Sequence, residues 1–321
     1  MAQLTELKLE NEITQGYRYA KGSASNIVSG IRQFLLFTAY FELKPIPACE
    51  ITTVLFLEFM GRSASYNHVK HLLSCVSYLH QSLNYDFSIY SFQIRATLQG
   101  LKRRLAKVPF QVLPLTPEIL RNMYSLLDMN KTEDLALWCS FLCAFFGLLR
   151  KANTVPETLN SESRCLLIRH VKVDQVSNMV YLYVGYSKNN NFCTRDVVIP
   201  IPGNDDPALD LVRHILDLFS RVKVEGNSPA FSFSPKRFVT YSKFTSRLKI
   251  LLAKAGYNPE LFSGHSFRRG GATFLYECGG STIMIQASGD WASQCFVKYL
   301  YLTEKQRLSA QLLMRSGIEA L

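Results

Sequence analysis

One stretch near the end of the chain decides the fold: Ser263-Gly264-His265-Ser266-Phe267-Arg268-Arg269-Gly270-Gly271-Ala272-Thr273. Its polar Ser-Gly start and the apolar residues that follow predict the beginning of a helix. His265 and Arg268 are three positions apart, so they share one face of the first turn. Free backbone N–H groups and a positive partial charge gather at such a helix end. With an imidazole and a guanidinium added, this end is predicted to hold a phosphate group.

Aromatic residues with polar tips follow this stretch, namely Trp291, Tyr299 and Tyr301. The indole N–H can only donate a hydrogen bond, and a phenol oxygen can act as a nucleophile. Donors around a phosphate with a hydroxyl beside them are the arrangement that phosphoryl transfer requires. The residues alone leave Tyr299 and Tyr301 as two candidates for that hydroxyl.

The composition indicates a globular protein with a polyanionic partner. The chain has 321 residues, 48% of them hydrophobic, which is enough for two domains with buried cores. A net charge of +11 and a pI near 9.2 favour nucleic acid as the partner. The eight cysteines show no disulfide-framework or zinc-ligand spacing. No signal peptide and no membrane span is predicted, so we expect a cytosolic or nuclear protein. The spacing of the cysteines and histidines predicts no metal site.

The apolar periodicity predicts a mainly α-helical protein with a small antiparallel β-sheet. Residues 1–22 are polar and are expected to form an N-terminal arm, and residues 23–107 carry four or five amphipathic helices. Residues 108–114 are bounded by prolines and predict a linker. Residues 115–321 then form a second domain, which includes a C-terminal tail.

Three strands are expected in the second domain, at residues 165–168, 179–184 and 195–200. Lys188 lies in the polar segment between the second and third strands, so it is predicted at a hairpin tip. Taken by itself, it has the pattern of an ordinary exposed lysine. Arg150 follows a long apolar helix, where its charge needs an anionic partner.

Six residues in a fixed order define the tyrosine recombinase family. This sequence resembles that family, because the same residue types occur in the same order: Arg150, Lys188, His265, Arg268, Trp291 and Tyr299. The resemblance covers the family's catalytic domain over about residues 113–310, and the helical part resembles its core-binding domain. Phrases such as Gly-Leu-Leu-Arg-Lys-Ala-Asn-Thr-Val-Pro (147–156) are most similar to eukaryotic mobile-element recombinases of the DIRS, Ngaro and Crypton kinds. The implied fold is a helical core-binding domain plus an α+β catalytic domain.

The resemblance implies an enzyme that cuts and rejoins DNA through a 3′-phosphotyrosyl intermediate without a cofactor. Arg150 and Arg268 would clamp the non-bridging phosphate oxygens. Lys188 would protonate the leaving 5′ oxygen.

The remaining site residues also take their roles from the resemblance. His265 would assist proton transfer or donate to the phosphate, and Trp291 would donate from its indole N–H. The family spacing favours Tyr299 over Tyr301 as the nucleophile. Many members have an acidic residue three positions after the first arginine, where this chain has Asn153; an amide there can still orient the arginine.

Double-stranded DNA is the implied partner. The predicted DNA contacts are Lys102, Arg103, Arg104, Lys107 and Arg269, although the basic run also fits a solvated helix end. Recombination implies a tetramer on DNA, held together through the tail at residues 309–321.

Two other functions are compatible with this sequence. A domesticated DNA-binding protein that has lost recombination and a type IB topoisomerase would use the same fold. A nuclear location follows only if the eukaryotic resemblance holds; otherwise the protein is cytoplasmic.

Overall fold

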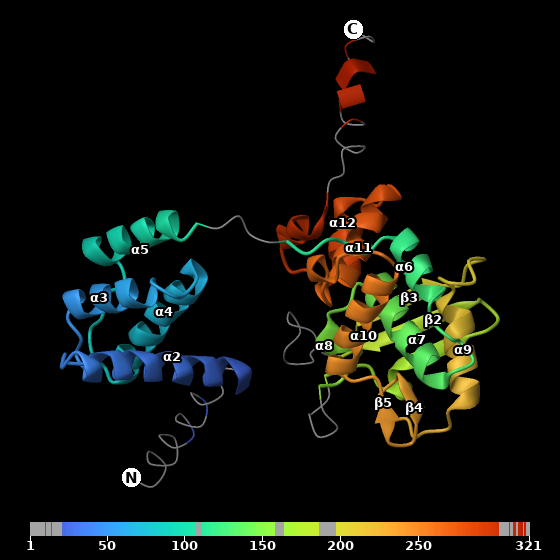
Figure 1. Ribbon diagram of the computed structural model, residues 1–321, viewed down its shortest axis with the longest axis horizontal. Coiled ribbons are helices and arrows are strands. Elements are labelled where there is room, and N and C mark those ends of the chain that lie inside the picture. Colours follow the sequence, from blue (N-terminus) through green and yellow to red (C-terminus); the bar gives the residue numbers. More distant parts are fainter. Residues whose placement is uncertain are drawn as a thin grey trace. The chain divides into compact units, whose positions relative to one another are not determined.

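The computed structural model describes residues 21–106, 111–157, 164–185 and 197–301, together with isolated positions within 10–14 and 308–318. The predicted arm lies almost wholly outside these residues, and so do Lys107 and Lys188. The chain divides into two compact units, Met1–Pro109 and Phe110–Leu321 (Figure 1). The division falls inside the segment that the prolines predicted as a linker.

The described part of the first unit is helical, with α2 (Lys21–Tyr40), α3 (Glu50–Met60), α4 (Tyr66–Ser82) and α5 (Phe92–Arg104). Serine side chains cap the N-termini of two of these helices: Ser65 accepts from the backbone N–H of His68, and Ser91 accepts from that of Ile94. Buried aromatic and aliphatic side chains from all four helices form the core, namely Phe34, Phe37, Phe56, Leu57, Val69, Leu72, Leu73, Val76, Ile94 and Leu101.

The second unit combines helices with a small sheet. Its elements are α6 (Pro117–Tyr124), α7 (Thr132–Phe146), α8 (Lys151–Thr154), η1 (Ile168–His170), β1 (Val171–Asp174), β2 (Met179–Val184), β3 (Val197–Pro202), α9 (Leu211–Arg221), β4 (Ser232–Ser234), β5 (Arg237–Phe238), α10 (Tyr241–Lys254), η2 (Pro259–Leu261), α11 (His265–Glu277), α12 (Thr282–Ser288) and η3 (Gln294–Tyr299). The predicted fold class, mainly α with a small antiparallel sheet, is confirmed. Every described helix is too short or too polar to cross a lipid bilayer.

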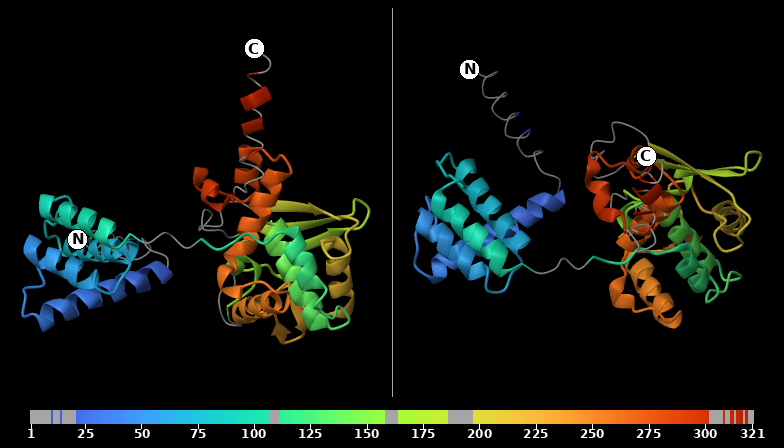
Figure 2. Two further views of the ribbon diagram at one scale, coloured as in Figure 1. Left: turned by 45° about the horizontal axis from the view of Figure 1, so that its top comes forward. Right: turned by 90° about the horizontal axis from the view of Figure 1, so that it is seen from above.

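The sheet has the order β1-β2-β3 with antiparallel pairing throughout. Alternate side chains of β2 face the core, and Leu182 pairs with Val171 on one side and with Ile199 on the other. Helix α9 packs against all three strands (Figure 2). The sheet therefore gives one buried face to the core that α7 fills.

One predicted strand is wrong. Residues 165–168 form no strand of this sheet; Leu167 makes only an isolated bridge to Pro229, and the first strand begins at Val171. The run is apolar because Cys165, Leu166 and Leu167 are buried under neighbouring segments. Periodicity alone cannot distinguish such a buried connection from a buried strand.

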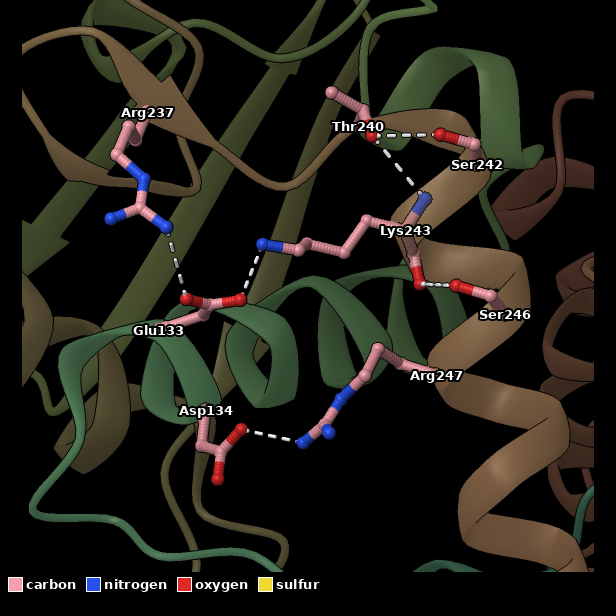
Figure 3. Close-up of polar contacts among 8 residues, drawn as sticks. All are labelled: Glu133, Asp134, Arg237, Thr240, Ser242, Lys243, Ser246 and Arg247. Carbon is pink, nitrogen blue, oxygen red and sulfur yellow. Dashed lines mark hydrogen bonds and ion pairs between the residues drawn. The ribbon is translucent and has the colours of Figure 1, made fainter.

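Helix α7 is buried on nearly all sides, and charged contacts hold α10 against its first turn. Glu133 accepts from Lys243 and lies 3.8 Å from Arg237, and Asp134 pairs with Arg247 at 2.6 Å (Figure 3). Carboxylates are also favoured at a helix N-terminus by its partial positive charge. Because α10 leads through η2 into α11, these contacts help to position the helix of His265 and Arg268.

Helix α11 approaches both α7 and the segment before α6 very closely, and paired glycines make this possible. A Cβ on Gly271 would collide with the carbonyl oxygen of Phe145, and one on Gly270 with that of Leu115. We expect Gly271→Ala to lower the free energy of unfolding by about 2 kcal/mol or more, since backbone atoms would have to move. Tryptophan fluorescence measures this, because Trp138 and Trp291 both lie in the second unit.

Gly100 supplies the contrasting substitution. It lies in α5 with nothing near its Cβ position, so Gly100→Ala is expected to stabilise its helix by about 0.5–1 kcal/mol. Circular dichroism during denaturation reports that change. An unchanged unfolding midpoint for Gly271→Ala would contradict the close approach.

Candidate active site

Arg268 lies at the centre of the site, on the first turns of α11. Its side chain is only 3% exposed, and its guanidinium donates to the carbonyl oxygens of Leu148 and, at 2.6 Å, of Gly289. Its Nε is buried with no partner among the described residues. Burial lowers the pKa of Arg268 to about 10, helped by the charge of Arg150, while Tyr299 acts in the opposite direction. Arg268 is thus a desolvated cation whose Nε–H can donate to an added acceptor.

Unusual backbone turns present those two carbonyl groups. Leu148 follows the end of α7 with a φ of +47°, and Asp290 follows the end of α12 with a φ of +48°. Non-glycine residues in this left-handed region cost about 1 kcal/mol or more each. Strain of this kind at both segments that hold Arg268 is typical of a functional site.

Trp291 packs directly against Arg268. The guanidinium carbon lies 4.0 Å from the centre of the indole ring, and the indole Nε1 is buried without a partner among the described residues. A Cβ on Gly289 would collide with the same ring, so glycine is required there. The side chains of Arg268 and Trp291 therefore pack together, and each carries a buried donor without a partner among the described residues, which is costly unless an acceptor binds.

The candidate nucleophiles occupy different positions. The ring of Tyr299, at the end of η3, lies 5.3 Å from that of Trp291 and 5.5 Å from the guanidinium carbon of Arg268. Tyr301 is 42% exposed, and the centre of its ring lies 5.8 Å from the guanidinium carbon of Arg269. The Thr273 hydroxyl bonds to the backbone of both residues: it donates to the carbonyl oxygen of Tyr299 and accepts from the N–H of Tyr301. Tyr299 is the candidate beside Arg268 and Trp291, whereas Tyr301 is beside Arg269, whose Nε is a further buried donor without a partner among the described residues.

Arg150 and His265 join the same region. Arg150 precedes α8 and lines a small cavity together with Arg268. His265 is the first residue of α11, and its backbone N–H donates to the hydroxyl of Ser263. Partial burial, and then the charges of Arg268, Arg150 and Lys151, lower the pKa of His265. The imidazole is therefore kept neutral at physiological pH.

This lowered pKa predicts a pH effect on stability. A group whose pKa is lower in the folded state contributes stability above its unfolded pKa, about 6.5 for histidine, and loses it as the pH falls. We expect the wild-type protein to lose more unfolding free energy than His265→Gln when the pH is lowered from about 7.5 to about 5. Denaturant titrations at both pH values measure the difference. Equal losses in the two proteins would show that neither burial nor the neighbouring arginines lower the pKa of His265 in the folded protein.

The other predicted contacts are placed as follows. Lys188 and Lys107 lie outside the described residues, while Lys102, Arg103 and Arg104 are exposed at the end of α5. Arg104 pairs with Glu58 at 2.8 Å. Arg269 is 7% exposed and donates to the Gln111 side chain, so it ties α11 to the segment that enters the second unit. The DNA contacts of these residues stay predictions. Across the described residues, no cluster of metal-binding side chains is present.

A polar groove on the first unit was missed from the sequence. It has a volume of about 320 Å³ between α2 and α4, and its lining comprises Asn26, Ser29, Gly30, Gln33, His68 and His71. Amides and imidazoles of this kind can contact base edges, and Arg32 and Lys70 are exposed on the same two helices. The only signal in the sequence was that the exposed N-terminal halves of both helices contain no acidic residue.

The fold is shared with solved DNA integrases and recombinases. A lambda integrase dimer bound to a COC′ core site is 17% identical, with 91% of this chain and 93% of that chain covered and a TM-score of 0.57. The Tn1549 transposon integrase in complex with transposon right end DNA is 13% identical, with 97% of both chains covered and a TM-score of 0.55. The XerH site-specific recombinase bound to a palindromic difH substrate is 13% identical, with 83% and 70% covered and a TM-score of 0.54.

No protein-family model and no curated protein sequence matches the chain. The structural likeness extends over both units and shows the fold of the tyrosine recombinases, as the sequence predicted. The resemblance to DIRS, Ngaro and Crypton elements stays a prediction.

Proposed function

We propose that this protein is a site-specific DNA recombinase that cuts and rejoins DNA through a covalent 3′-phosphotyrosyl bond on Tyr299. One observation carries the proposal: Arg268 Nε and Trp291 Nε1 are buried donors without partners among the described residues, and the Tyr299 ring lies against both side chains. A phosphodiester supplies the missing acceptors and the electrophile together. The shared fold supports the same conclusion, because the similar structures are DNA complexes of integrases and a recombinase.

The proposed reaction is a transfer of the phosphoryl group. The Tyr299 oxygen forms a bond to phosphorus, the bond from phosphorus to the 5′ oxygen breaks, and Lys188 protonates that leaving oxygen. His265, neutral because its pKa is lowered, accepts the tyrosine proton. Arg150 and Arg268 neutralise the charge that develops on the non-bridging oxygens. The phosphotyrosyl ester retains the bond energy, so a 5′ hydroxyl of another strand can reverse the step.

DNA binding and assembly complete the proposal. The basic end of α5 and the polar groove between α2 and α4 are surfaces suited to the phosphate backbone and to base edges. A solved lambda integrase tetramer, 16% identical and with a TM-score of 0.57, is bound to a Holliday junction. For this chain we propose a tetramer whose tails dock on neighbouring protomers, since Leu312, Met314 and Ile318 are exposed apolar side chains. A nuclear location would accompany a eukaryotic mobile-element origin.

Covalent capture tests the proposal. The protein is incubated with a pool of nicked duplexes of randomised sequence, with EDTA present, and separated under denaturing conditions. We expect DNA-linked protein. Salt-sensitive binding without any adduct would instead indicate a DNA-binding protein that performs no strand transfer. Relaxation of a supercoiled plasmid of unrelated sequence would indicate a topoisomerase.

A further inference from the structure

An acidic residue, Asp290, lines the small cavity beside Arg150 and Arg268. The cavity has a volume of about 20 Å³, room for about one water molecule. Arg150, Asn153, Arg268 and Asp290 are the charged and amide-bearing residues of its lining, and Val197 is among its apolar residues. Among these described lining residues, Asp290 alone is acidic.

The backbone of Asp290 has an unfavourable conformation. Its φ of +48° lies in the left-handed region, where glycine is favoured and aspartate is among the better tolerated alternatives. Its N–H donates to the carbonyl oxygen of Ala287, and the preceding Gly289 offers its own carbonyl to Arg268. A glycine would form this turn with less strain. A side chain kept here despite that strain suggests a function for the carboxylate.

The charges in the cavity supply that function. Arg150 and Arg268 repel each other in a poorly solvated space, which disfavours both being charged there. The charge of Asp290 acts in the opposite direction on Arg268. Asn153 is 6% exposed and lines the same cavity, but its amide carries no charge. Without Asp290, the cavity would hold two positive charges until an anion arrived.

We propose that Asp290 is a positioning residue, whose negative charge offsets the repulsion between the guanidinium groups of Arg150 and Arg268 until the scissile phosphate binds to them. This inference rests on the proposed function. Because Asn153 lines the same cavity, a carboxylate at that position would face the same arginines. The pair of positions therefore allows the charge to be removed at one of them and returned at the other.

The test compares the adduct rates of four variants with that of the wild type on the nicked duplex pool. Asp290→Asn keeps the shape and the tolerance for the left-handed turn, and Asp290→Gly removes the side chain while relaxing the turn. Both are expected to lower the adduct rate about tenfold, since misplaced arginines lose transition-state contacts. Asn153→Asp combined with Asp290→Asn is expected to recover most of the rate. Asp205→Asn, at an exposed aspartate of the same unit, is the control and should react like the wild type.

A second readout does not depend on activity. Sodium sulfate is added at constant ionic strength, with sodium chloride as the reference, and the thermal midpoint is measured. Sulfate should raise the midpoint of Asp290→Asn more than that of the wild type, because the uncompensated arginines bind an anion more tightly. The double variant should respond like the wild type.

The outcomes separate this inference from the proposed function. A wild-type adduct with an unchanged rate in Asp290→Asn or Asp290→Gly would overturn the role of Asp290 alone. A slow double variant would overturn it too, since the turn and not the charge would then matter. If even the wild type forms no adduct, the proposed function fails, and the sulfate response decides the inference: equal shifts in wild type and Asp290→Asn would refute it.

Discussion

Tyr299→Phe is expected to form no covalent DNA adduct, whereas Tyr301→Phe forms it at a rate close to that of the wild type. Removing the phenol oxygen of Tyr299 removes the nucleophile that lies beside Arg268 and Trp291. Tyr301 faces Arg269 and is partly exposed, so its oxygen is not positioned for the same phosphate. Denaturing gels of the reaction with nicked duplexes measure both rates.

DNA affinity is the control for these two variants. Each substitution removes one oxygen from an aromatic ring, so salt-dependent binding should be unchanged. An adduct that persists in Tyr299→Phe would contradict the assignment of the nucleophile. Loss of the adduct in Tyr301→Phe alone would transfer that role to Tyr301.

Arg268→Lys is expected to lower the rate of adduct formation by about 10²–10³-fold while the protein still binds DNA. A lysine keeps the charge, but its donors all leave from one nitrogen and cannot replace the planar fork that reaches the carbonyl groups of Leu148 and Gly289 with two nitrogens and leaves Nε for the phosphate. Single-turnover rates on saturating DNA isolate the chemical step from binding.

Arg247→Lys is the matched control on α10. Arg247 pairs with Asp134 and is not one of the candidate site residues, and a lysine can preserve that contact (Figure 3). Its adduct rate should therefore equal that of the wild type. An Arg268→Lys protein as fast as this control would show that the guanidinium fork is not needed.

Local patterns predicted those parts of the structure that depend on neighbouring residues. The helix that begins at His265 and the strand Met179–Val184 lie where periodicity placed them. Arg150 follows the buried helix α7 and its short C-terminal turn, as the apolar run indicated. In each case the period of the side chains decides the element, because burial of one face is a local property.

Contacts between distant segments were beyond sequence reasoning. The bonds from Arg268 to Leu148 and Gly289 join residues that are far apart in the chain, and Arg269 was predicted on DNA but donates to Gln111. Asp290 shows no pattern of its own, since its importance comes from a left-handed turn and a shared cavity. Such positions depend on how helices pack, which residue type and spacing do not encode directly.

The most direct test of Tyr299 as the nucleophile is to locate the attached nucleotide on the protein. The adduct from the nicked duplex pool is digested with nuclease and protease, and the nucleotide-bearing peptide is sequenced by mass spectrometry. We expect a nucleotide joined through its 3′ phosphate to Tyr299, with a free 5′ hydroxyl on the released strand. A linkage at Tyr301 or at any other residue, or one through a 5′ phosphate, would contradict it.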